Sequence, residues 1–179
     1  MKNTAIFSIR KISLIALLST LAYVGRILFA WIPNVQPVTV ILLIITLEIG
    51  LVEGILTAIL SMFLSNIFLG MGPWTLYQVA SFAIVILVFS CLKSLWSRTW
   101  KQPLLKLVFF TIMAGLTGYL YGFVISIFSV YFYHIPKFWV YYLQGLPFDT
   151  LHTLGNIGFW MILSPLLPRI IQKYQTKFQ

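Results

Sequence analysis

The sequence predicts an all-α integral membrane protein, folded as one six-helix bundle with both termini in the cytoplasm. The 179 residues are 60% hydrophobic and only 8% charged, whereas soluble domains carry about 25% charged residues. Their mean hydropathy is +0.98. Separate apolar stretches come close to the roughly 20 residues that a helix needs to cross a bilayer. Basic residues gather between alternate stretches, as the cytoplasmic loops of membrane proteins do.

The first three helices are delimited by proline, glycine and charge. Pro33 and Pro37 end the first apolar run, because proline interrupts a helix. That run is longer than the core of a signal peptide and lacks a small-residue cleavage site, so we expect it to be retained. The next apolar stretch is too long for one span, and the turn "LEIGLVEG" divides it. The predicted spans are 12–31, 38–51 and 54–69.

The last three helices follow a turn, a basic loop and a proline. The turn "GMGP" precedes the fourth span, and a basic segment separates the fourth from the fifth. Residues 134–146 are aromatic and polar, which predicts a short interfacial helix or a structured loop. Pro147 suits the first turn of the sixth helix. The predicted spans are 74–92, 104–133 and 147–168, so the whole chain, 1–179, forms a single membrane domain.

The basic residues predict the orientation of the bundle. Ten of the twelve Lys and Arg residues fall on one side of a six-span arrangement, and the positive-inside tendency makes that side cytoplasmic. Topology and anionic lipid account for the net charge of +9 without a nucleic-acid partner. The ten are Lys2, Arg10, Lys11, Lys93, Arg98, Lys101, Lys106, Arg169, Lys173 and Lys177.

Polar and aromatic residues gather on the opposite, outer side and predict a ligand cavity there. At helical spacing, Asp149, His152 and Asn156 share one face of the sixth span. The polar groups are predicted to converge on one ligand between aromatic walls, the arrangement of most small-molecule pockets. The predicted substrate-binding residues are Arg26, Trp31, Asn34, Gln36, Trp74, Tyr77, Gln78, Trp139, Tyr142, Asp149, His152 and Asn156.

Each of these residues also has a structural interpretation. Tryptophan and tyrosine form interfacial belts in membrane proteins, and Arg26 lies near enough to its helix end to snorkel. Asp149 in a first helical turn would be stabilised by the helix dipole whatever its function. However, an ionisable group near the bilayer centre costs roughly 2.5 to 3.5 kcal/mol. The prediction that Arg26, Asp149 and His152 lie at one depth therefore favours the ligand site.

Two stripes of small residues predict close helix packing. Ala114, Gly118 and Gly122 repeat every fourth residue in the fifth span and predict packing within the bundle. The stripe of the first span lies near its cytoplasmic end and can face another subunit. Its members, which we predict to dock a partner, are Ser13, Ala16 and Thr20.

The chain lacks the sequence motifs that mark several classes of enzyme and metal-binding protein. The chain contains no G-x-x-x-x-G-K-[ST] loop for ATP and no G-x-S-x-G nucleophile turn. Its two histidines and one cysteine lack metal-ligand spacing. Glu48 and Glu53 are predicted on the opposite side of the membrane from Asp149. We therefore expect no catalytic residue, no bound metal and no cofactor, and neither an enzyme nor an ion-driven pump.

The stretch "IRKISLIALLSTLAYVGRILFAWIPNVQPVTVI", followed by a Gly-Pro-Trp turn before the fourth span, resembles the S-components of energy-coupling factor (ECF) transporters. The resemblance covers nearly the whole chain. It implies a vitamin-binding subunit of the bacterial cytoplasmic membrane, partnered by a transmembrane T-component and two cytoplasmic ATPases that use ATP. The Ala-x-x-x-Ala docking stripe of that family corresponds to Ala16 and Thr20, with a threonine in place of the second alanine. The segment from Asn34 to Pro37 would be a rigid outer loop that closes over the ligand.

The predicted cavity would open at the outer side through a wide entrance lined by aromatic and amide side chains. Such an entrance suits a large, mostly uncharged ligand. An anionic vitamin would favour several basic groups, and only Arg26 and Lys137 are predicted on the outer side. Together with the "IPNVQP" segment, this predicts a cobalamin-type S-component. Folate, pantothenate and a queuosine precursor remain alternatives, and so do a stand-alone carrier or channel for a small solute and a structural subunit without a ligand.

Overall fold

The computed structural model describes residues 9–98 and 100–176, which form eight helices and no strand. This confirms the all-α prediction for the described residues. The helices are α1 (Ile9–Leu28), α2 (Val38–Glu48), α3 (Leu51–Leu69), α4 (Trp74–Ser90), α5 (Lys93–Ser97), α6 (Pro103–Phe132), α7 (Phe138–Leu163) and α8 (Leu167–Thr176).

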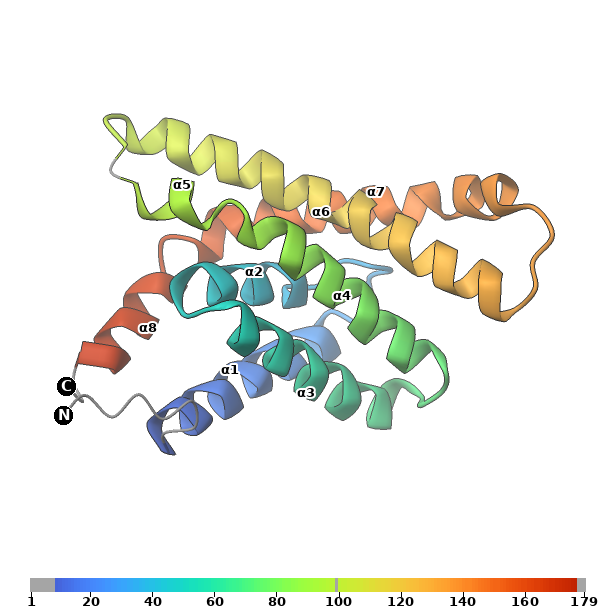
Figure 1. Cartoon of the computed structure of the whole chain (residues 1–179), viewed down its shortest axis with the longest axis horizontal. Coiled ribbons are helices and arrows are strands. Elements are labelled where there is room, and N and C mark those ends of the chain that lie inside the picture. Colours follow the sequence, from blue (N-terminus) through green and yellow to red (C-terminus); the bar gives the residue numbers. More distant parts are fainter. Residues whose placement is uncertain (1–8, 99, 177–179) are drawn as a thin grey trace.

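Two groups of helices pack around α2. The long helices α6 and α7 form an antiparallel hairpin along one side of the molecule, and α1 and α3 pack together on the other (Figure 1). Helix α4 contacts both α3 and α6 and so joins the two groups. Helices α5 and α8 lie at one end, and the loops that follow α3 and α6 lie at the other (Figure 1).

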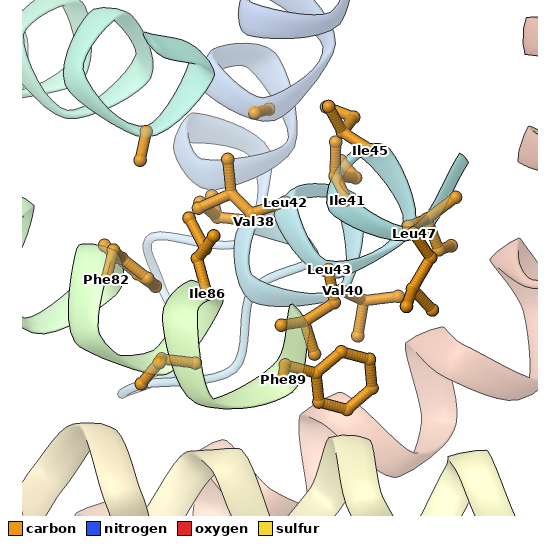
Figure 2. Packing of buried hydrophobic residues seen from close by; sticks show 14 of the residues in the cluster. Val38, Val40, Ile41, Leu42, Leu43, Ile45, Leu47, Phe82, Ile86 and Phe89 are labelled. Carbon is orange, nitrogen blue, oxygen red and sulfur yellow. The ribbon is translucent and has the colours of Figure 1, made fainter. Parts of the chain in front are cut away.

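Helix α2 is the centre of the core. Every residue from Val38 to Leu47 is buried, and α2 contacts every other helix. Figure 2 shows Phe89 of α4 facing Val40 and Leu43 of α2. A helix that is apolar all round needs neighbours on every side, which explains why this short helix is enclosed.

Glycines bring the two helices of the hairpin together. A Cβ atom on Gly118 would lie 2.6 Å from the backbone nitrogen of Thr153, and one on Gly115 would lie 2.8 Å from Ile157. A Cβ atom on Gly122 would collide with the carboxylate of Asp149. The glycines of the stripe in α6 therefore serve packing within the chain, as the sequence predicted.

The predicted start of the last long helix is wrong. Helix α7 begins at Phe138, so Pro147 lies inside it and residues 138–146 belong to it. Proline removes one backbone hydrogen bond, but the added turns pack on α6, where Phe123 contacts Phe138 and Tyr142 at ring-centroid distances of 5.6 and 5.4 Å. Neighbouring helices often allow a proline within a membrane helix. Helix α7 also ends earlier than predicted, and α8 follows at a bend of 48°.

Among the described residues, three helices are long and apolar enough to cross a membrane, namely α1, α3 and α6, and the bent pair α7–α8 would make a fourth. Helices α2 and α4 are apolar but shorter, with 11 and 17 residues. The turn between α2 and α3 lies at Ile49 and Gly50, a few residues earlier than predicted. The count of six spans and the cytoplasmic location of the termini stay predictions.

Several charged side chains make contacts near α5 and α8. Lys11 forms an ion pair with Glu53, and Lys93 donates to the carbonyl oxygen of Ile49 at 3.3 Å. The carboxylate of Glu48 accepts hydrogen bonds from Trp96 Nε1 at 2.6 Å and from Gln172 Nε2 at 2.9 Å. Helices α2, α5 and α8 are thus tied together at a single end.

Candidate functional site

A buried polar network joins α1, α3 and α4 around Arg26. Nη1 of Arg26 donates to Ser65 Oγ and, at 2.8 Å, to Asn66 Oδ1. The amide nitrogen of Asn66 donates to Thr75 Oγ1 at 2.8 Å and to Gln78 Oε1 at 2.7 Å. Arg26 is only 8% exposed, so its guanidinium is turned into the bundle and does not snorkel to the surface. Arg26 and Gln78, both predicted site residues, thus belong to one network.

A second polar group lies on the face of α7 that the sequence identified. Asp149, His152 and Asn156 are all buried there. Nε2 of His152 lies 2.7 Å from Thr39 Oγ1, and the amide of Asn156 donates to Thr117 Oγ1 at 3.4 Å. Within the described residues, Asp149 Oδ2, His152 Nδ1 and Asn156 Oδ1 have no hydrogen-bond partner. An unpaired buried polar group is costly. Ser19, Ser81, Thr153 and Trp160 also carry such atoms, but the face with Asp149, His152 and Asn156 holds three of them at helical spacing.

Tyr121 of α6 packs beside the polar face of α7. Its ring contacts His152 at a centroid distance of 5.2 Å and Phe82 at 4.5 Å. Phe82 belongs to α4, the helix that also carries Thr75 and Gln78 of the network around Arg26.

A cavity of about 310 Å³ lies between α6 and α7 beside Asp149. Its lining includes Ser126 of α6 and Gln144 of α7. Its volume is at the lower end of the roughly 300 to 1,000 Å³ of ligand pockets. A second cavity, of about 360 Å³, lies along α7 at Val35 and Gly158, and its lining is mainly apolar.

The loop between α1 and α2 folds back onto the bundle. Asn34 adopts φ 57° and donates from Nδ2 to the carbonyl oxygen of Phe148 in α7 at 3.3 Å. Asparagine tolerates this left-handed conformation better than most residues. A Cβ atom on Gly25 would come within 2.5 Å of the ring of Pro37, so this glycine lets the loop pack on the last turn of α1. Gln36 is half-buried in the same loop.

The predicted aromatic walls do not join the buried polar face. Trp31 is 79% exposed and Trp139 is 64% exposed, and Trp74 Nε1 donates to the carbonyl oxygen of Gly70 at 3.2 Å. Tyr77 stacks on Phe128 of α6 at 6.0 Å. Tyr142 packs against aromatic rings of α6 and α7 at the outer part of the hairpin. Trp74 follows the loop after α3, and Trp139 and Tyr142 follow the loop after α6, so these three rings belong to the end of the bundle that holds those loops (Figure 1).

The predicted docking stripe lies on the surface of α1. Ser13, Ala16 and Thr20 are all exposed. Ser13 Oγ donates to the carbonyl oxygen of Ile9 at 3.0 Å, and Thr20 Oγ1 donates to that of Ala16 at 2.9 Å. Both hydroxyl groups are therefore paired within their own helix, and the stripe presents a narrow, mostly apolar surface.

The sequence analysis missed the partners of the predicted residues. The central one is Asn66, an amide within an apolar helix, which is a recognisable pattern because polar residues in such helices often bond across helices. The positions of Thr39 and Tyr121 depend on how α2 and α6 pack, which no local pattern indicates. The missed residues are Thr39, Ser65, Asn66, Thr75, Thr117 and Tyr121.

Comparison with known proteins identifies the family. A family model described as "ECF transporter, substrate-specific component" matches residues 10–171. No curated protein and no solved structure matches the chain. Members of this family are membrane subunits that bind the substrate, and the ATPase activity lies in partner subunits. The chain belongs to the family of substrate-specific components of ECF transporters.

Proposed function

We propose that this chain binds a vitamin, cobalamin, at the outer side of the membrane and delivers it to partner subunits that hydrolyse ATP. Membership of the ECF family supports a substrate-binding subunit of an importer over a stand-alone carrier. The observation that carries the proposal is the set of unpaired buried polar atoms on α7, at Asp149, His152 and Asn156. A ligand that pairs with these atoms removes the cost of leaving them unsatisfied.

The scarcity of basic side chains around the polar face of α7 favours a mostly uncharged ligand. Arg26 is buried, and its Nη1 is occupied by Ser65 and Asn66. Lys137 is exposed at the tip of the α6–α7 hairpin, outside the polar face of α7. A vitamin carboxylate would therefore meet no Lys or Arg side chain among the residues of that face, whereas a vitamin rich in amides finds acceptors there. Cobalamin carries many amide groups and fits this requirement better than folate or pantothenate.

The exposed stripe on α1 is the proposed contact with the T-component. Ser13, Ala16 and Thr20 are small, and their surface lets a second helix approach closely. Two cytoplasmic ATPases would complete the transporter at the basic end of the bundle, where Lys11 and Lys93 lie. The chain itself binds no cofactor in this proposal. Its vitamin is the cargo.

Equilibrium titration of the purified chain with cobalamin, folate and pantothenate tests the proposal. One neutral hydrogen bond contributes about 0.5 to 1.5 kcal/mol, so His152→Ala should weaken cobalamin binding roughly two- to thirteenfold. Asn34→Ala should weaken it in the same range, because the loop loses its bond to α7. Gln102→Ala is the control, since this N-cap residue of α6 makes no capping bond through its side chain.

Two results would contradict the proposal. Tight binding of folate or pantothenate that depends on Arg26 would replace cobalamin with an anionic vitamin. Flux of a small solute through liposomes that contain this chain alone would indicate a channel or carrier.

A further inference from the structure

We infer that the cavity between α6 and α7 receives a primary carboxamide arm of the substrate, with Asp149 accepting from its N–H groups and Gln144 donating to its carbonyl oxygen. The inference rests on the proposed vitamin-binding function and adds the chemical group that this part of the site recognises. Three features of the structure support it: the burial of Asp149, the open space beside its carboxylate and the polar groups that line this space.

Asp149 needs a hydrogen-bond donor for Oδ2, and none of the described residues supplies one. Its side chain is 6% exposed, and Oδ2 has no hydrogen-bond partner within the described residues. The lining of the cavity contains no Lys, Arg or His. A buried carboxylate without a donor is strongly unfavourable. A ligand with N–H groups would provide the missing hydrogen bond.

Two glycines shape the surroundings of Asp149. Gly122 of α6 lies against the carboxylate, where any Cβ atom would collide with it. Gly145, one turn before Asp149 in α7, has nothing within 4 Å of the position of a Cβ atom. The cavity that they line measures about 310 Å³. A corrinoid ring system is too large for this space, but a single side arm of it fits.

The polar groups match a carboxamide better than a carboxylate or an ammonium group. Asp149 accepts hydrogen bonds, and the side-chain amide of the lining residue Gln144 can donate. A primary carboxamide presents both a donor and an acceptor to this pair. A carboxylate would face the negative charge of Asp149, and an ammonium group would leave the Gln144 donor without an acceptor.

The test compares cyanocobalamin with its monocarboxylic acid derivatives, in each of which one amide arm is converted to a carboxylate. Titrations use the purified full-length chain, as wild type and as Asp149→Asn. Wild type should bind at least one monocarboxylate about tenfold or more weakly than cyanocobalamin, because a lost charge-assisted hydrogen bond has at least this effect. Asp149→Asn should bind cyanocobalamin about tenfold more weakly, and the preference for the amide over the carboxylate should shrink, because asparagine can donate to the carboxylate.

A second variant tests the cavity without altering Asp149. Gly145→Leu places a side chain in the open space and should weaken cyanocobalamin binding while the chain still folds. Gly145→Ala is the matched control, since it adds only a methyl group where nothing lies within 4 Å of a Cβ position and should bind cyanocobalamin as wild type does. Glu53→Gln removes a carboxylate charge at the opposite end of the bundle and controls for Asp149→Asn.

The outcomes separate this inference from the function on which it rests. Cyanocobalamin binding that stays within about twofold in both Asp149→Asn and Gly145→Leu would overturn the carboxamide site and leave the vitamin-binding function intact. Selective binding of pantothenate, which has no primary carboxamide, would also overturn the inference. The absence of binding to cobalamin, folate and pantothenate, with no small molecule co-purifying, would overturn the proposed function itself.

Discussion

Replacing Asn66 with alanine should destabilise the bundle by disconnecting α1, α3 and α4. Asn66 is 1% exposed and makes three hydrogen bonds, with Arg26, Thr75 and Gln78. On the scale of soluble proteins, two neutral bonds at about 0.5 to 1.5 kcal/mol each and one charged bond at about 1.5 to 3 kcal/mol would contribute about 2.5 to 6 kcal/mol. Within membranes, side-chain hydrogen bonds average about 0.6 kcal/mol, because the unfolded state also finds partners there. Helix α3 is long and apolar enough to cross a membrane, so the membrane scale applies to Asn66, and we expect a loss of about 2 kcal/mol from three such bonds.

Reversible unfolding of the purified chain in mixed micelles measures this loss. Wild type, Asn66→Ala and Gln102→Ala are compared, and the exposed Gln102 should change the free energy of unfolding by less than about 0.5 kcal/mol. An Asn66→Ala value as small as that of Gln102→Ala would refute the role of the network. A double-mutant cycle with Arg26→Met then isolates the bond between Arg26 and Asn66.

Three further predictions concern packing, the basic end and partner docking. Gly118→Ala should lower the free energy of unfolding by about 1 to 3 kcal/mol, because its methyl group would meet the backbone of Thr153; an unchanged value would show that the two helices can separate at no cost. Glu48→Ala should speed amide hydrogen exchange in α8, since Trp96 and Gln172 lose their acceptor, and exchange at the wild-type rate would argue that other contacts hold α8. Ala16→Phe should reduce ATP-driven uptake into proteoliposomes while the affinity of the isolated chain for cobalamin stays the same. An equal loss of uptake and of cobalamin affinity would indicate that the stripe packs within the chain and does not contact a partner.

Much of the fold could be predicted from the sequence, because apolar runs and the proline, glycine and charged residues that end them are local features of the chain. The start of α2 at Val38 and the first residues of α4 and α6 follow directly from such patterns. The error at Pro147 has a different origin. The helix continues through this proline because residues 138–146 pack on α6, and this tertiary contact outweighs a local preference that the sequence does show.

The candidate site was predictable in part for the same reason. The face shared by Asp149, His152 and Asn156 follows from helical spacing alone, and the structure buries all three. Their partners were not predictable, because contacts such as that of His152 with Thr39 join residues far apart in the chain. The cavity beside Asp149 also depends on Gly122, whose role becomes visible only when α6 and α7 are paired.

Native mass spectrometry of the isolated chain tests the central claim most directly. The account predicts one cobalamin bound to each chain purified from cells supplied with the vitamin, without any ATPase or T-component present. It also predicts that His152→Ala releases the vitamin at lower collision energy than wild type does. A chain that carries no small molecule and also fails to bind added cobalamin would contradict the account.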